Sequence, residues 1–167
     1  PVAATFFKQA AKRGAKLIVI DPRGLALREY ATYMLQFKPA SDVALLNAIM
    51  HVIVEEKLYD VQYLQAYTEH FESLKGHLSS YSPESMADIC GIDAVTIRKV
   101  ARDFGRAERA MIFWGMGISQ HVHGTNNARC LIALALICGQ VGRPGTGLHP
   151  LRGQNNVQGA SDAGLIP

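Results

Sequence analysis

Two short apolar runs, each followed at once by turn-forming residues, constrain the fold of this chain more than any other feature. The first covers residues 17–20 (Leu-Ile-Val-Ile) and leads into Asp-Pro-Arg-Gly at 21–24, and the second covers residues 110–114 and leads into Gly115. Unbroken apolar runs of this length, bounded by turns, are typical of strands buried on both faces of a parallel sheet. The sequence therefore predicts an α/β domain with a small, mostly parallel sheet flanked by helices.

Helical patterns surround the two predicted strands. They cover residues 5–13, 41–53, 82–90, 93–105 and 126–138, and short helices are expected within 59–75. The boundaries of one helix are the clearest, because Asp93 can cap its first turn and Gly105 ends its apolar stripe. From residue 142 onward Gly, Asn and Gln dominate, and a loop of this length is improbable as a mere connection. We therefore divide the chain into an α/β domain at 1–141 and a functional loop at 142–167.

Composition narrows the class of protein. With 167 residues and 49% hydrophobic content, the chain fits one globular domain. Its formal net charge of +3 comes from scattered Lys and Arg without a dense basic run, so neither nucleic acid nor a membrane surface is an expected partner. Three cysteines without a Cys-x-x-Cys pair indicate no disulfide framework and fit a reducing, cytoplasmic setting. No apolar run is long enough to cross a bilayer.

The two ends of the sequence favour an internal fragment. The chain opens at Pro1 without an initiator Met, inside a helical pattern, and it stops at Pro167 within a loop rich in Gly, Asn and Gln. We expect both ends to continue in a longer polypeptide.

The residues that follow the two strands are candidates for ligand binding, because open parallel sheets bind ligands beyond the carboxyl ends of their strands. Asp21 can accept a hydrogen bond from a ribose hydroxyl or a base, and Arg23 can hold a phosphate through two parallel hydrogen bonds. Gly115 and Gly117 allow a ligand to approach the backbone closely. Taken alone, such short motifs favour a plain turn.

Arg152 is the most informative charge in the last part of the chain. It stands among Gly, Gln and Asn, whose side chains suit a polar ligand, and its planar guanidinium matches a carboxylate such as formate. A surface arginine on a solvated loop is the alternative that composition alone favours. His121 and His123 predict no metal site, because no third ligand stands at a recognisable spacing. For His149 we expect a structural role.

Five segments, taken together, carry a resemblance to a known family. They are residues 18–23 (Ile-Val-Ile-Asp-Pro-Arg), 41–47 (Ser-Asp-Val-Ala-Leu-Leu-Asn), 114–120 (Trp-Gly-Met-Gly-Ile-Ser-Gln), 142–147 (Gly-Arg-Pro-Gly-Thr-Gly) and 152–160 (Arg-Gly-Gln-Asn-Asn-Val-Gln-Gly-Ala). The chain resembles the large (alpha) subunit of molybdopterin-dependent formate dehydrogenases over almost its whole length. The last segment is nearly the signature loop of that family. Related nitrate reductases differ where Arg152 stands, so the loop favours formate as the substrate.

The resemblance implies a Rossmann-like domain of a larger multidomain subunit that oxidises formate to carbon dioxide. It also implies a bis(molybdopterin guanine dinucleotide) cofactor with molybdenum or tungsten, from which electrons pass to a [4Fe-4S] cluster and an electron-transfer subunit or domain. Ile20, Asp21 and Arg23 would line one guanosine diphosphate half of the cofactor. Asp42 would accept hydrogen bonds from the N–H groups of the guanine.

The resemblance assigns the remaining site residues to the pterin and the substrate. Residues that would contact the pterin or its phosphates are Met116, Gly117, Gln120, Gly153 and Gln154. Arg152 would bind formate beside the metal and stabilise charge as two electrons and a proton leave. No residue of the chain is expected to ligate a metal.

Departures from the family pattern limit what the chain can do alone. Residues 161–164 read Ser-Asp-Ala-Gly where the family usually has Cys-Asp-Met-Gly. The cysteine cluster motif, the cysteine or selenocysteine metal ligand and its neighbouring histidine are absent, and they would lie upstream of Pro1. The domain that encloses the other side of the cofactor would lie downstream of Pro167. We therefore expect the chain by itself to be catalytically silent.

Two other functions stay open from the residues. One is a bis-pterin oxidoreductase with a substrate other than formate. The other is a stand-alone nucleotide-binding or interaction module without redox activity.

Overall fold

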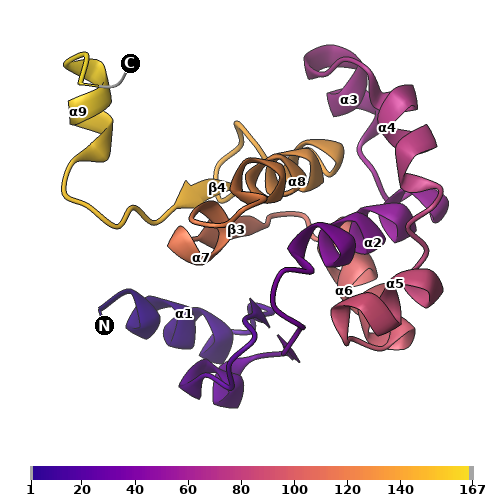
Figure 1. Cartoon of the computed structure of the whole chain (residues 1–167), viewed down its shortest axis with the longest axis horizontal. Helices are drawn as coiled ribbons and strands as arrows, with labels where there is room; N and C mark the ends of the chain where they lie inside the picture. Colours follow the sequence, from indigo (N-terminus) through magenta and orange to yellow (C-terminus); the bar gives the residue numbers. More distant parts are fainter. Residues whose placement is uncertain (1, 166–167) are drawn as a thin grey trace.

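A computed structural model describes residues 2–165 and confirms the α/β class. Helices are more numerous than strands (Figure 1). In chain order the elements are α1 (Val2–Lys12), β1 (Ile18–Ile20), the 3₁₀ helix η1 (Ala26–Tyr30), β2 (Tyr33–Leu35), α2 (Asp42–Glu55), α3 (Val61–Tyr67), α4 (Phe71–Leu78), α5 (Pro83–Cys90), α6 (Ala94–Gly105), β3 (Met111–Trp114), α7 (Met116–Ser119), α8 (Gly124–Ile137), β4 (Gly147–Pro150) and α9 (Val157–Asp162).

The strands pair in parallel, as predicted, but they form two separate pairs instead of one sheet. β1 pairs with β2, so that Ile20 lies opposite Leu35, and β3 pairs with β4, so that Trp114 lies opposite Pro150. β4 and α9 lie in the segment that was expected to be a loop. The sequence of β4 is Gly-Leu-His-Pro, which has no run of β-branched residues. This strand therefore depends on the edge that β3 offers.

The prediction that both strands are buried on two faces is wrong for this chain. In β1 only Val19 is buried, and Ile20 is 38% exposed. In β3 the side chains of Met111 and Phe113 are 46% and 41% exposed, whereas those of Ile112 and Trp114 pack against the core. In the β3–β4 pair, Ile112 and Leu148 lie opposite each other and both pack against the helical core, which leaves Met111 and Phe113 on the less covered face. On the other side of β3, Phe7 of α1 only touches the edge of Phe113, with ring centroids 5.0 Å apart.

The core is built around α2, which is apolar on most sides. Its buried residues include Leu45, Ile49 and Ile53, and the helix packs against α4, α5, α6 and α8. Arg98 of α6 ties this helical layer together from outside, because its guanidinium donates to Glu84 at 3.0 Å and to Glu55 at 2.8 Å. The helical layer thus supports the sheet pairs from one side.

Helix ends follow the predicted signals closely. The carboxylate of Asp93 accepts a hydrogen bond from the backbone N–H of Thr96 at 2.8 Å, and α6 begins at the next residue. Ser82 caps α5 in the same way and is followed by Pro83 at the first helical position. Within residues 2–165, no helix combines the length and the apolar character needed to span a membrane.

Candidate functional site

The candidate site is a pocket at the carboxyl ends of β3 and β4. Because the two strands are parallel, the residues that follow Trp114 and Pro150 meet at the same edge. The pocket has a volume of about 190 Å³. It is lined by Trp114, Gly115, Met116, Ser119, Gln120, Pro150, Leu151, Arg152, Gly153, Gln154 and Val157.

Five of the predicted site residues therefore share one pocket, and they come from two segments far apart in the sequence. They are Met116, which begins α7, Gln120, which directly follows α7, and Arg152, Gly153 and Gln154 from the segment after β4. Gly117 also lies in α7 but does not line the pocket, and a Cβ atom added there would meet open space. Sequence reasoning missed Ser119 and Val157 as lining residues, because neither has a distinctive side chain.

The polar side chains of this pocket are available to a ligand. Within the part of the chain that the structure describes, no hydrogen bond or ion pair involves the side chains of Gln120, Arg152 or Gln154. All three are exposed, and no acidic residue lines the pocket. Residues that carry one guanidinium and two amides thus line one pocket, which suits an anionic ligand with several polar groups.

A second group of predicted residues follows β1. The guanidinium of Arg23 donates to both carboxylate oxygens of Asp21, at 3.0 and 3.1 Å, and the backbone N–H of Arg23 donates to the same carboxylate at 2.8 Å. These hydrogen bonds lower the pKa of Asp21 below its ordinary value. The two residues therefore bind each other here, through Nε and one Nη of Arg23. Ile20, Asp21 and Arg23 do not line the pocket at β3 and β4.

Asp42 is the first residue of α2 and is 7% exposed. No side-chain hydrogen bond or ion pair of Asp42 occurs among residues 2–165. A carboxylate at a helix N-terminus is stabilised by the helix dipole. Its oxygens remain free to accept hydrogen bonds. Asp42 follows β2 in the sequence and does not line the pocket at β3 and β4.

Histidines and cysteines take structural positions. The ring of His149 stacks on Phe113 with centroids 4.7 Å apart, and its Nε2 is buried without a hydrogen-bond partner among the described residues. His121 Nδ1 accepts from the backbone N–H of His123 at 3.2 Å, which is a local turn contact. No group of three or more His, Cys, Asp or Glu in the described chain could hold a metal ion. Burial raises the pKa of the Cys138 thiol to about 12, so this thiol is a poor nucleophile.

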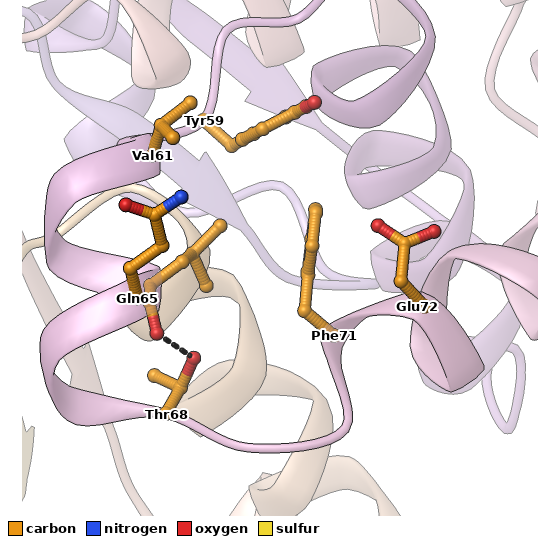
Figure 2. A pocket seen from close by; sticks show the side chains of 7 residues that line it. Tyr59, Val61, Gln65, Thr68, Phe71 and Glu72 are labelled. Carbon is orange, nitrogen blue, oxygen red and sulfur yellow. Dashed lines mark hydrogen bonds between the residues drawn. The ribbon is translucent and has the colours of Figure 1, made fainter.

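A larger cavity, of about 290 Å³, lies beside α3 and α4, away from the predicted residues. Figure 2 shows its lining, in which the rings of Tyr59 and Phe71 pack against each other with centroids 4.9 Å apart. The hydroxyl of Thr68 donates to the backbone oxygen of Leu64 at 2.8 Å, and Glu72 is paired with Lys75. Size alone would select this cavity, but no cationic residue lines it and Glu72 adds a negative charge.

Comparison with known proteins identifies the family. The family model described as molybdopterin oxidoreductase matches residues 1–166. The chain belongs to the molybdopterin oxidoreductase family. This confirms the resemblance that the five sequence segments carry.

The molybdopterin oxidoreductase chain has longer relatives. It is 44% identical to formate dehydrogenase H of Escherichia coli over all 167 residues, which is 23% of that protein. It is also 44% identical to the F420-dependent formate dehydrogenase subunit alpha of Methanocaldococcus jannaschii, of which it covers 25%. Acetylene hydratase from Pelobacter acetylenicus has a similar fold, with a TM-score of 0.79 and 33% identity over 83% of this chain and 19% of that one. The chain thus spans about a quarter of the length of its curated relatives.

Family membership implies a molybdopterin cofactor, and the residues at the carboxyl ends of the strands fit such a group. The pocket offers unpaired donors for phosphates and for the polar pterin edge. Asp42 offers a free carboxylate of the kind that accepts from guanine N–H groups. These donors and acceptors match the chemistry of a pterin nucleotide.

Proposed function

We propose that this chain forms part of the cofactor and substrate site of a formate dehydrogenase. One observation carries the proposal: Gln120, Arg152 and Gln154, whose side chains have no partner among residues 2–165, line one pocket at the carboxyl ends of β3 and β4. The similarity to two proteins named formate dehydrogenases supports formate as the substrate.

The pterin side of the proposal concerns the pocket itself. Met116, Gln120 and Gln154 would contact the pterin or its phosphates, together with the backbones of Gly117 and Gly153. Amide side chains can both donate and accept, which suits the mixed donor and acceptor edge of a pterin. When bound, a bis(molybdopterin guanine dinucleotide) carrying molybdenum or tungsten supplies the centre that takes up two electrons.

The guanine side of the proposal concerns the β1–β2 pair. Asp42 would accept hydrogen bonds from the guanine, since its carboxylate has two oxygens and no partner within the described chain. Asp21 would accept from the ribose, next to Ile20. Arg23 would exchange the carboxylate of Asp21 for the diphosphate, an exchange that costs little because its side chain is 77% exposed.

Arg152 would bind formate. Its guanidinium can hold both carboxylate oxygens at once, which fixes the direction of the C–H bond. Formate that gives up two electrons and one proton becomes neutral carbon dioxide. The ion pair with Arg152 is then lost, which favours release of the product. We place the [4Fe-4S] cluster and the electron-transfer partner outside this chain, and the free thiols of Cys90, Cys130 and Cys138 support a reducing, cytoplasmic setting.

A different substrate is the second candidate. The fold similarity to acetylene hydratase, whose name describes another reaction, favours it. The family match disfavours a binding module unrelated to redox enzymes.

The test is an Arg152→Lys variant of the cofactor-loaded parent enzyme. Lysine keeps the positive charge but loses the planar fork, so we expect kcat/KM for formate to fall about 100-fold at unchanged metal and pterin content. Arg129→Lys is the matched control, because Arg129 is exposed on α8 and does not line the pocket. The activity of this variant should stay at the wild-type level. An Arg152→Lys enzyme as active on formate as the control would refute the substrate assignment.

A further inference from the structure

Arg152 lies between two residues that contact neighbouring elements: Leu151 contacts β3, and Gly153 contacts α7. On its N-terminal side, the backbone N–H of Leu151 donates to the carbonyl oxygen of Trp114 at 2.7 Å. This bond continues the β3–β4 pairing by one residue beyond Pro150. The carbonyl oxygen of Leu151 also lies close to Gly115, where an added Cβ atom would be 3.7 Å from it. The backbone just before Arg152 is therefore fixed to the end of β3.

On the C-terminal side of Arg152, Gly153 packs against the side chain of Met116. A Cβ atom on Gly153 would lie only 2.7 Å from Cε of Met116, and closer still to its sulfur. Gly153 is not among the described residues with positive φ, so its backbone does not require glycine. The thioether of Met116 occupies the place of a side chain at residue 153, so a larger residue there must displace the end of this flexible, 40% exposed side chain.

Met116 itself stands on an anchored turn. Its carbonyl oxygen accepts from the backbone N–H of Gln120 at 2.7 Å, which closes α7. The carbonyl of Ile118 accepts from the side chain of Asn127, a buried residue of α8, at 3.1 Å. α7 is thus held against α8, which fixes the backbone of Met116.

We propose that the contact between Gly153 and Met116 is a positioning contact that, with the bond from Leu151 to Trp114, sets where Arg152 points. The inference rests on the proposed role of Arg152 in binding formate. Gly153 and Met116 act through Arg152 and through the pocket wall that they share. A displacement of about 1 Å at a substrate-holding group can cost about 100-fold in rate, so such a contact matters for catalysis.

The direct test measures hydrogen exchange of the Leu151 amide in the full 167-residue chain by NMR. Gly153→Ala pushes the thioether away, and Met116→Ala removes it, so each variant loses the same contact. We expect each to speed Leu151 exchange about tenfold by local opening. The double variant should be no faster than the faster single variant, because one contact can be lost only once. Two controls add or remove the same atoms elsewhere: Gly76→Ala on α4, where an added Cβ atom meets open space, and Met111→Ala, whose side chain is 46% exposed on β3.

Two results would overturn the proposal. In the first, exchange at Leu151 stays within about twofold of wild type in both single variants. In the second, the effects of the two single variants multiply in the double variant. In the parent enzyme, Gly153→Ala should raise KM for formate more than it lowers kcat, at unchanged metal and pterin content. Leu151 exchange tests the contact between Gly153 and Met116, whereas the kinetics of Arg152→Lys test formate as the substrate. One proposal can therefore be wrong while the other holds.

Discussion

Gln140 gives the sharpest prediction for the scaffold beneath the site. Its side chain is 1% exposed and joins the end of α8 to the segment that leads into β3. The amide oxygen accepts from the backbone N–H of Ala110 at 2.9 Å, and the amide nitrogen donates to the carbonyl of Ala107 at 2.8 Å. Gln140→Leu keeps the volume but leaves both backbone groups without these partners.

The magnitude follows from those two bonds. A buried backbone group that loses its partner costs about 1–3 kcal/mol. Two such groups, offset by about 1 kcal/mol from the added apolar burial, give an expected loss of about 3 kcal/mol in the free energy of unfolding. At a typical slope of about 2 kcal/mol/M, the urea midpoint falls by about 1.5 M.

The assay is urea unfolding followed by circular dichroism. Gln62→Leu is the control, since Gln62 is exposed on α3 and should shift stability by no more than about 0.5 kcal/mol. If the urea midpoint of Gln140→Leu falls by less than about 0.3 M, the two hydrogen bonds of Gln140 contribute no more than an ordinary surface residue, and the predicted loss is wrong.

Three further predictions concern other residues. Asp93→Ala should destabilise the chain by about 1 kcal/mol through loss of the α6 cap. Because the hydrogen bonds from Thr96 lower the pKa of Asp93, this contribution is present above the ordinary carboxyl pKa and is lost as pH falls through the folded-state pKa. Urea unfolding at pH 7 and at pH 3 will measure the difference. Arg23→Ala should return the pKa of Asp21 towards its ordinary value in an NMR titration, and an unmoved pKa would show that the ion pair does not form in solution. Cys138 should react with a thiol reagent only as fast as the chain opens, so its labelling rate should rise with urea rather than with pH between 7 and 9.

Helix boundaries were the most predictable part of the fold, because local signals determine them. Asp93 and Ser82 cap their helices through bonds within three residues, which a linear sequence displays directly. The strands at 18–20 and 111–114 were also placed within a residue or two. β4 could not be predicted, since its pairing depends on a partner strand about 36 residues earlier and not on its own composition. The same dependence on distant partners explains why two strand pairs replaced the expected single sheet.

The site was predictable where strand topology determines it. The rule that ligands collect beyond the strand ends, together with the family resemblance, selected Met116, Gln120 and Arg152, and these residues share one pocket. The pairing of Asp21 with Arg23 was not predicted, because a side chain without its ligand takes the nearest opposite charge. Gly153 was selected for its backbone, whereas its steric relation to Met116 exists only in three dimensions.

The proposed function requires cofactor atoms at the carboxyl ends of β3 and β4, beside Arg152. The direct measurement is anomalous X-ray diffraction at the molybdenum or tungsten edge from crystals of the cofactor-loaded parent enzyme. We expect the metal peak on the side of the pocket that Arg152 faces, with pterin density in contact with Gln120 and Gln154. A metal peak remote from this pocket, with Gln120, Arg152 and Gln154 still facing solvent, would contradict the proposed cofactor site.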